Sequence, residues 1–230
     1  SAFSDYPAAA TKLPHVADAS GVNIEALLVE KPDLVLVWPN GTSEADIVRL
    51  KMLGIRTEAI GIFTLADVAN ALRRIGQLAD TSKTADFAAD QFELRRRMLQ
   101  NKYAHAKKVP TFFEISHAPL MTINGLHFIS QVISLCGGAN IFADVRQLVF
   151  QPSREMLLIK SPQVIFFGAN KLAGKSAMLR DAALYAGLNA AQQGNIFALE
   201  ADLILRPGPR LIDAAEEACG ILETIRRKVG

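Results

Sequence analysis

Histidines are the residues in this chain most able to hold a metal ion or to transfer protons. The chain has four of them, His15, His105, His117 and His127, and none lie at the i, i+4 or short-loop spacings that bring two ligands to one ion. His117 and His127 share a loop region, so a metal-binding protein or enzyme that uses them together with Glu114 is retained as an alternative. The spacing predicts no metal site.

Two further patterns resemble catalytic or nucleotide-binding motifs. Ser116 directly precedes His117, and the sequence has no Gly-x-Ser-x-Gly turn that would present a serine nucleophile. The segment 168–176 follows a predicted strand and precedes a predicted helix, as a phosphate-binding loop does. It has five residues where that motif has four, and no acidic strand end accompanies it to bind magnesium. We therefore expect a binding protein without a cofactor, not an enzyme.

Aromatic and polar residues at predicted strand ends are the remaining candidates for a binding site. Tyr6, Trp38, Phe63, Phe150 and Asp202 all fall in predicted loops. Several such side chains around one cleft would form an apolar site with a few polar groups that orient a ligand. The alternative is that the single tryptophan fills a gap in a core.

Composition excludes several classes of partner. The formal charge of +2 on 230 residues is too small to indicate nucleic acid or an anionic membrane, and we interpret 95–97 and 107–108 as the basic, solvated face of a long helix. No apolar run approaches the roughly 20 residues of a membrane span. The chain opens without Met in a loop-like sequence, so we expect a trimmed start.

One stretch occurs twice and predicts the organisation of the whole chain. Residues 24–37 and 154–167 align so that Glu25 pairs with Glu155 and Pro32 with Pro162. Each copy reads as a short helix, a proline that ends it, and an apolar strand buried on both faces, as in a parallel sheet. Two copies predict two similar lobes.

The remaining pattern alternates strands with helices, which predicts an α/β fold. Helices are expected at about 24–30, 43–53, 65–78, 82–106, 128–135, 176–185 and 209–227, and strands at 34–37, 55–60, 111–115, 164–167 and 196–199, with loops at 1–21 and 201–208. We place an amino-terminal lobe at 1–80, a linking helix at 81–108 and a carboxyl-terminal lobe at 109–230.

Several short motifs occur in an order that resembles a known family. These are Ser4-Asp5-Tyr6-Pro7, 21–25, 31–38, 69–72, 136–142, 153–155 and Pro209-Arg210. Together they resemble the periplasmic cobalamin-binding proteins that serve ABC importers, in the long-helix class of substrate-binding proteins. The resemblance implies a monomeric periplasmic protein with two Rossmann-like lobes, a single rigid helix between them and ligand in the cleft. It also implies that a signal peptide and the first strand–helix unit of the amino-terminal lobe are missing.

The resemblance also implies roles for individual residues. Trp38 would stack on the corrin ring with Phe3 in a similar role, and Asp202 would accept a hydrogen bond beside Arg206. Ala19 and Val149 stand where the family has tryptophans, so haem or a ferric siderophore is the alternative to a corrinoid such as cobalamin or cobinamide. The expected ligand-binding set is Phe3, Tyr6, Trp38, Glu114, Val149, Phe150, Asp202 and Arg206.

The resemblance adds a disulfide and a docking surface. Composition alone leaves Cys136 and Cys219 open between buried thiols and a disulfide, and the resemblance implies the disulfide. Glu25 and Glu155 would meet arginines of a two-fold symmetric importer permease. The alternative for both glutamates is simple stabilisation of a helix start by a carboxylate.

Overall fold

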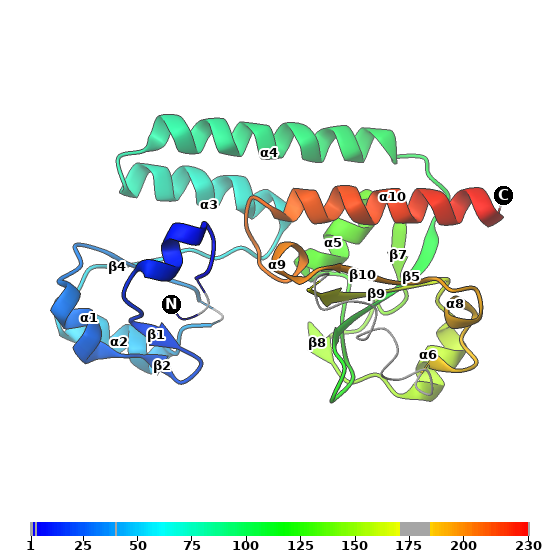
Figure 1. Ribbon diagram of the computed structural model, residues 1–230, viewed down its shortest axis with the longest axis horizontal. Helices are drawn as coiled ribbons and strands as arrows, with labels where there is room; N and C mark the ends of the chain where they lie inside the picture. The colour runs from blue at the N-terminus through cyan, green and yellow to red at the C-terminus, as the bar shows by residue number, and fades with distance from the viewer. Residues whose placement is uncertain (1, 3, 40, 171–184, 230) are drawn as a thin grey trace. The chain divides into compact units, whose positions relative to one another are not determined.

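The chain divides into two compact units, 1–61 and 62–230, which we call the amino-terminal and carboxyl-terminal units (Figure 1). The computed structural model describes residues 2, 4–39, 41–170 and 185–229. Among these residues, no helix combines the length and apolar character needed to span a bilayer. The expected lobe boundaries and the linking role of 81–108 stay predictions. The predicted helix at 176–185 falls almost entirely outside the described residues.

The amino-terminal unit is a small α/β arrangement with a parallel strand pair. In chain order its elements are η1 (Ala8–Lys12), β1 (Ala17–Asp18), β2 (Gly21–Val22), α1 (Ile24–Glu30), β3 (Val35–Val37), α2 (Glu44–Met52) and β4 (Thr57–Ala59). β3 and β4 run parallel, and β1 and β2 antiparallel. The short elements η1, β1 and β2 replace the loop expected at 1–21.

Helix α1 begins and ends where its sequence dictates. The Asn23 side chain accepts a hydrogen bond from the Ala26 amide at 3.0 Å, and Lys31 ends the helix in the left-handed region at φ 47°. Leu27 packs in a core with Val37 and other apolar residues of this unit. Leu36 lies on the opposite face of β3 and is 45% exposed, so the expected burial of this strand on both faces is wrong. The described part of this sheet has only two strands, and helices pack on the face that carries Val37.

The carboxyl-terminal unit is built on a mixed sheet of order β10-β9-β5-β6-β8, with β7 paired to the start of β5. Its helices are α3 (Leu65–Leu78), α4 (Ser82–Lys102), α5 (Phe128–Leu135), α6 (Arg154–Lys160), α8 (Asn189–Gln192), α9 (Ala201–Ile204) and α10 (Leu211–Val229). Its strands are β5 (Val109–Ser116), β6 (Met121–Ile123), β7 (Gly138–Asn140), β8 (Val149–Phe150), β9 (Val164–Ala169) and β10 (Ile196–Glu200). β10, β9, β5 and β7 are parallel, whereas β6 and β8 join antiparallel.

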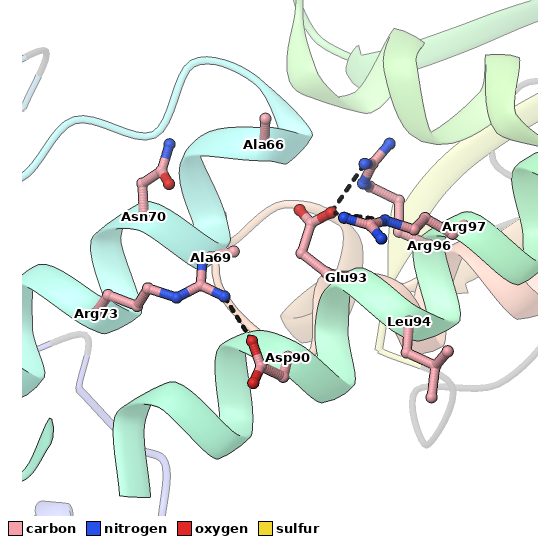
Figure 2. A pocket seen from close by; sticks show the side chains of 9 residues that line it. All are labelled: Ala66, Ala69, Asn70, Arg73, Asp90, Glu93, Leu94, Arg96 and Arg97. Carbon is pink, nitrogen blue, oxygen red and sulfur yellow. Dashed lines mark hydrogen bonds and ion pairs between the residues drawn. The ribbon is translucent and has the colours of Figure 1, made fainter. Parts of the chain in front are cut away.

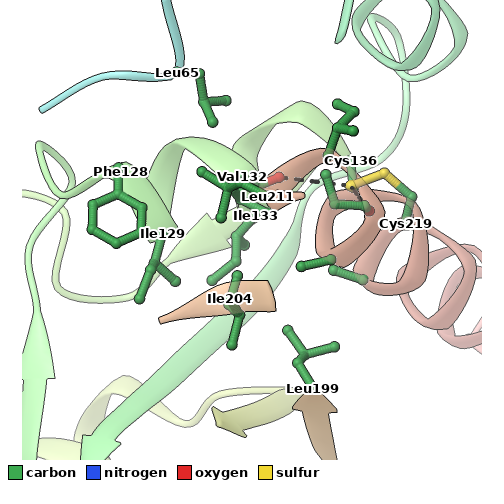
Figure 3. Packing of buried hydrophobic residues seen from close by; sticks show 14 of the residues in the cluster. Leu65, Phe128, Ile129, Val132, Ile133, Cys136, Leu199, Ile204, Leu211 and Cys219 are labelled. Carbon is green, nitrogen blue, oxygen red and sulfur yellow. Dashed lines mark hydrogen bonds between the residues drawn. A yellow bond between two sulfur atoms is a disulfide. The ribbon is translucent and has the colours of Figure 1, made fainter. Parts of the chain in front are cut away.

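Both faces of the parallel strands are covered. Phe113 and Phe166 belong to a large apolar cluster with α3, α4, α5 and α10, part of which Figure 3 shows. Their neighbours Phe112 and Ile165 point to the other face and pack in a second cluster with Leu157 of α6. The expectation of a strand buried on both faces is therefore correct for β9, the second copy of the repeat.

The second copy of the repeat reproduces the local structure of the first. The Ser153 hydroxyl accepts a hydrogen bond from the Met156 amide at 3.2 Å, and α6 ends with Ser161 in the left-handed region at φ 44°. Pro162 then leads into β9. Each copy thus has a polar cap, a left-handed end, a proline and a strand, as α1 and β3 do.

Helices α3 and α4 form a hairpin within the carboxyl-terminal unit. The Thr64 hydroxyl and the Asp67 carboxylate complete a reciprocal cap at the start of α3. A Cβ atom on Gly76 would lie 2.3 Å from the Cβ atom of Ala85, so only glycine allows this close approach of the two helices. Helix α4 ends at Lys102, earlier than predicted, because Tyr103 turns inward and donates a hydrogen bond to Glu223 at 2.8 Å.

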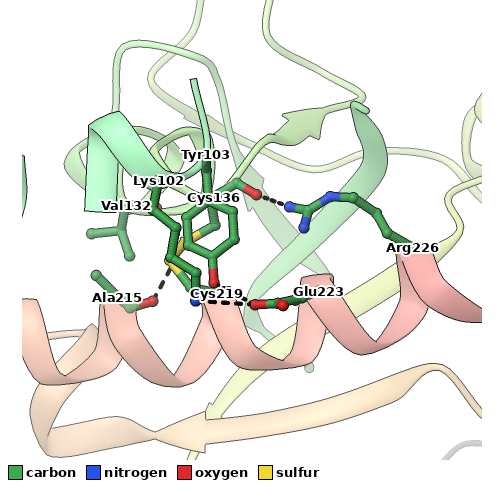
Figure 4. Close-up of a disulfide and its surroundings, with 8 residues drawn as sticks. All are labelled: Lys102, Tyr103, Val132, Cys136, Ala215, Cys219, Glu223 and Arg226. Carbon is green, nitrogen blue, oxygen red and sulfur yellow. Dashed lines mark hydrogen bonds and ion pairs between the residues drawn. A yellow bond between two sulfur atoms is a disulfide. The ribbon is translucent and has the colours of Figure 1, made fainter. Parts of the chain in front are cut away.

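Helix α10 is fastened to its neighbours by a disulfide and a group of polar contacts (Figure 4). Cys136 at the end of α5 is bonded to Cys219 on α10, with Cα atoms 4.8 Å apart, which confirms the predicted disulfide. Arg226 donates hydrogen bonds to the carbonyl oxygens of Cys136 and Lys107. The end of α10 is thereby fixed against α5 and the start of β5.

Replacement of both cysteines by alanine should lower the free energy of unfolding by about 4 kcal/mol, because the bond closes a loop of 83 residues in the unfolded chain. Denaturant titration of Cys136→Ala/Cys219→Ala against the oxidised parent measures this loss. Reductant should destabilise the parent and leave the variant unchanged. Equal stability of the oxidised parent and the variant would contradict the assignment.

Candidate ligand-binding site

A small cavity lies where the parallel strands β5 and β9 end. Its volume is about 270 Å³, and its lining consists of residues 114–117 and 167–169. The pairing of β5 with β6 shifts register between Glu114 and Ser116, an irregularity that redirects side chains at a strand end. Ligands of α/β proteins bind at the carboxyl ends of parallel strands, so this is the expected edge of the sheet.

An acidic and a basic side chain give this cavity its polar end. Glu114 is buried, and its Oε1 lies 3.1 Å from Nδ1 of His117, which is 37% exposed. Phe167 and Gly168 supply the apolar part of the lining. The cavity can therefore accept a group that is mainly apolar and carries a hydrogen-bonding end.

Helix α9 closes over the end of β9. A Cβ atom on Gly168 would lie 2.9 Å from Cδ1 of Leu205, so the glycine lets the residue after α9 pack directly on the strand. The predicted loop at 201–208 is wrong at its start, because Ala201–Ile204 is helical and Ile204 is fully buried.

Two of the predicted ligand-binding residues form an ion pair on this segment. Arg206 lies 2.9 Å from Asp202, and their side chains are 41% and 45% exposed. The half-exposed pair offers both donors and an acceptor to solvent or ligand. A ligand that contacts it would share these groups with the pair.

Val149 and Phe150 do not line the cavity that holds Glu114. They form β8, two places from β5 in the sheet order, so the predicted loop position of Phe150 is wrong. Its ring packs edge-on against Phe142 with centroids 5.3 Å apart, which gives Phe150 a packing role on at least one side.

In the amino-terminal unit, the candidate residues are exposed aromatics. Trp38 directly follows β3 and is 47% exposed, and Tyr6 is 62% exposed. A Cβ atom on Gly41 would lie 2.6 Å from Cε3 of Trp38, so the indole lies over the turn that follows it. The alternative that this tryptophan fills a core gap is therefore wrong. Phe3 lies outside the described residues.

His127 has a structural role that sequence reasoning missed. Its Nδ1 accepts a hydrogen bond from the Ile129 amide at 3.2 Å and so caps α5. Burial lowers the pKa of the imidazole to about 4. Among the described residues, no three or more His, Cys, Asp or Glu side chains form a group that could hold a metal ion. The alternative metal site from His117, His127 and Glu114 thus lacks support.

The arginine run on α4 is largely paired within the carboxyl-terminal unit. A pocket of about 390 Å³ lies between α3 and α4, and Figure 2 shows the side chains that line it. Arg73 lies 2.6 Å from Asp90 there, and Arg96 lies 2.9 Å from Glu93. Arg97, which is 70% exposed, also lies near Glu93. The interpretation of this run as a solvated face is correct for Arg97 and wrong for Arg96.

Arg95 faces α10 instead and contacts two of its carboxylates. Its guanidinium lies 2.7 Å from both Asp213 and Glu216. The hydrogen bond to Glu216, together with the one to Asp213, raises the pKa of Arg95 above its usual range. Arg95 therefore fastens α4 to α10, which accounts for a charge in the run without an external partner.

Two α/β units with apolar and polar side chains at the carboxyl ends of parallel strands have the architecture in which α/β proteins bind small molecules. The chain belongs to the family described as periplasmic binding protein, whose sequence profile matches residues 1–203.

Vitamin B12-binding proteins are among the most similar relatives. That of Vibrio cholerae serotype O1 is 36% identical over 228 residues, which cover 99% of this chain and 82% of the relative. That of Yersinia pestis is 34% identical over 98% of this chain and 78% of the relative. These similarities confirm the family resemblance predicted from the sequence.

Solved structures agree in fold. The periplasmic vitamin B12 binding protein BtuF of Vibrio cholerae matches with a TM-score of 0.87 at 36% identity, covering 98% of this chain and 88% of that one. The periplasmic haem binding protein HutB of Vibrio cholerae matches with a TM-score of 0.79 at 20% identity, covering 95% and 87%. The second match shows the fold alone. Together they confirm the predicted α/β class.

Acidification should destabilise the carboxyl-terminal unit through His127. Its pKa is about 4 in the folded chain and about 6.5 in the unfolded chain, so the unfolded chain binds more protons between these values. The His127 contribution to stability is complete above pH 6.5 and is lost as the pH falls towards 4, by up to about 3 kcal/mol.

His127→Asn keeps a side chain that can cap α5 and removes the titration. Denaturant unfolding at intervals from pH 4 to 7.5 should show a shallower dependence in the variant. The exposed His15 provides the matched control, because His15→Asn should leave the pH dependence as in the parent. Identical curves for all three proteins would contradict the role of His127.

Proposed function

We propose that this protein is a periplasmic receptor that captures a corrinoid, cobalamin or cobinamide, and delivers it to an ABC importer. One observation carries the proposal, namely identity of 36% to a vitamin B12-binding protein along 99% of the chain. The match to the BtuF fold supports it. The work of such a receptor is differential binding, and it needs no catalytic group.

Trp38 supplies the stacking surface in this proposal. A corrin is a broad, largely apolar ring, and a half-exposed indole over a glycine turn can lie against it with little loss of side-chain freedom. Tyr6 offers a second exposed aromatic in the same unit. Phe3 is proposed to act as a further stacking residue.

The polar candidates suit the rim of a corrinoid, which carries amide side chains that both donate and accept hydrogen bonds. Asp202 accepts from an amide N–H, and Arg206 donates to an amide oxygen. Glu114 accepts a hydrogen bond from a further amide group inside the small cavity. The cavity volume of about 270 Å³ fits a side group of the corrinoid rather than its ring. Val149 and Phe150 are proposed as apolar contacts.

Calorimetric titration with cyanocobalamin, cobinamide, haemin and a ferric siderophore tests this function. We expect a corrinoid to bind with a Kd at or below about 1 μM, or −8 kcal/mol, and to quench the fluorescence of the only tryptophan. Trp38→Ala should weaken corrinoid binding at least about tenfold through lost stacking. Phe87→Ala removes an exposed aromatic side chain of α4 that has no proposed part in the site, and it serves as the control. Binding of haemin with no binding of either corrinoid would overturn the proposal.

The proposed docking groups are Glu25 on α1 and Glu155 on α6. Both are exposed and occupy the first turn of the two repeated helices. Hydrogen bonds from its own backbone amide and the Ser153 hydroxyl lower the pKa of Glu155, so this carboxylate stays charged at neutral pH. One such carboxylate on each copy of the repeat suits a two-fold symmetric permease with arginines at equivalent places.

Charge reversal in Glu25→Lys/Glu155→Lys should abolish importer binding and leave corrinoid affinity unchanged, because it replaces attraction to a basic partner with repulsion. Binding to importer in nanodiscs, with calorimetry on the same samples, gives both values. Glu30→Lys/Asp144→Lys makes the same change in net charge at other exposed acids and should bind as the parent does. Loss of corrinoid affinity in the first variant would contradict the docking assignment.

A further inference from the structure

Helices α1 and α6 expose large aliphatic side chains at the same two positions. Leu28 and Val29 are 45% and 76% exposed, and their counterparts Leu158 and Ile159 are 43% and 82% exposed. The preceding position is an inward leucine in both helices, with Leu27 and Leu157 buried. The repeat therefore reproduces an exposed apolar pair as faithfully as it reproduces a core residue.

Local structure does not require these side chains to be aliphatic. The helices are capped by Asn23 and Ser153, end in the left-handed region, and are anchored by the buried leucines. A β-branched side chain at Val29 or Ile159 lowers helix propensity slightly and leaves most of its surface in water. Single exposed aliphatics are ordinary, but the same pair at equivalent positions of two units indicates a common use.

The pair shares a helix face with the glutamate of each copy. Residues three and four positions apart are neighbours on a helix, so Leu28 and Val29 lie beside Glu25. Leu158 and Ile159 lie beside Glu155 by the same spacing. Each face thus combines one carboxylate with two exposed aliphatic groups, whereas the inward leucine points away from it.

We propose that these two faces are combined apolar and acidic docking surfaces, each of which inserts its aliphatic pair into an apolar depression beside a basic group on one of two equivalent importer subunits. The inference rests on the proposed function and extends it, because the aliphatic pairs supply affinity whereas the glutamates supply orientation. The charge and the duplication identify the partner. A carboxylate on each face favours a basic protein surface over anionic lipid, and two equal faces suit two equal subunits.

Serine substitution at the most exposed position of each pair tests the apolar contribution. Val29→Ser and Ile159→Ser should each weaken binding to the importer, reconstituted in nanodiscs from the organism's own genes, by about tenfold, and the double variant by about a hundredfold. The controls are Met52→Ser and Leu126→Ser, which remove aliphatic side chains that are 82% and 75% exposed elsewhere. Each control should stay within about twofold of the parent.

Corrinoid calorimetry on every sample separates this inference from the proposed function. A parent that binds no corrinoid overturns the proposed function. A different result overturns this inference alone. In that case the parent binds both corrinoid and importer, the charge-reversal variant no longer binds the importer, and the serine variants still bind it as the parent does.

Two other occupants of these faces give distinct results. If the serine variants bind empty nanodiscs more weakly than the parent does, by the same factor as for nanodiscs that contain the importer, lipid is the occupant and the inference is overturned. A parent dimer that the double serine variant dissociates, measured by sedimentation, would identify a second copy and overturn it as well.

Discussion

The burial of parallel strands on both faces is the constraint on which the carboxyl-terminal unit depends. Phe112 and Phe113 are adjacent in β5, are both almost fully buried, and belong to different apolar clusters. Such a strand needs helices on both sides of the sheet, which leaves its carboxyl end as the place where polar side chains can be presented. Glu114 and His117 occupy that end, next to a shift in strand register.

The same constraint explains the chemistry of α4 and α10. Helix α10 covers one face of the sheet with small and apolar residues, and its outer face must then be held against α4. Arg95 does this with Asp213 and Glu216, and Tyr103 does it through Glu223. The hydrogen bond from the Tyr103 hydroxyl has the largest effect on the pKa of Glu223, and the Lys102 ammonium has the next largest. Together they lower this pKa to about 2, so the contact persists across the physiological range of pH.

Sequence patterns predicted the elements whose cause is local. Helices α1, α3 and α5 have the predicted bounds, because apolar periodicity defines each of them and Asn23 marks the start of α1. The short strands β6, β7 and β8 were not predicted, since two or three residues carry no period and their pairing depends on partners distant in sequence. Helix α9 was missed for the same reason, as its four residues are held by the burial of Ile204.

The candidate site was predictable only in part. The exposure of Trp38 follows from its place after a strand and before a glycine turn, both visible in the sequence. The pairing of Glu114 with His117 could have been suspected from their separation of three residues at a strand end. The capping role of His127 could not, because a histidine before an apolar helix carries no signal that its ring is buried. The burial of the His127 ring depends on tertiary packing, which the local sequence does not reveal.

The repeat connects the two tasks of the proposed receptor. In each copy the chain reverses between a short helix and the strand that follows, so the start of the helix lies towards the carboxyl end of that strand. Glu25 therefore belongs to the same edge of its unit as Trp38, and Glu155 to the same edge as the cavity at the end of β9. In the proposed receptor, one helix–strand unit supplies both a docking group and a ligand-contacting group. Under that proposal, an importer that engages the helix starts would lie on the same edge of each unit as the groups that hold the ligand.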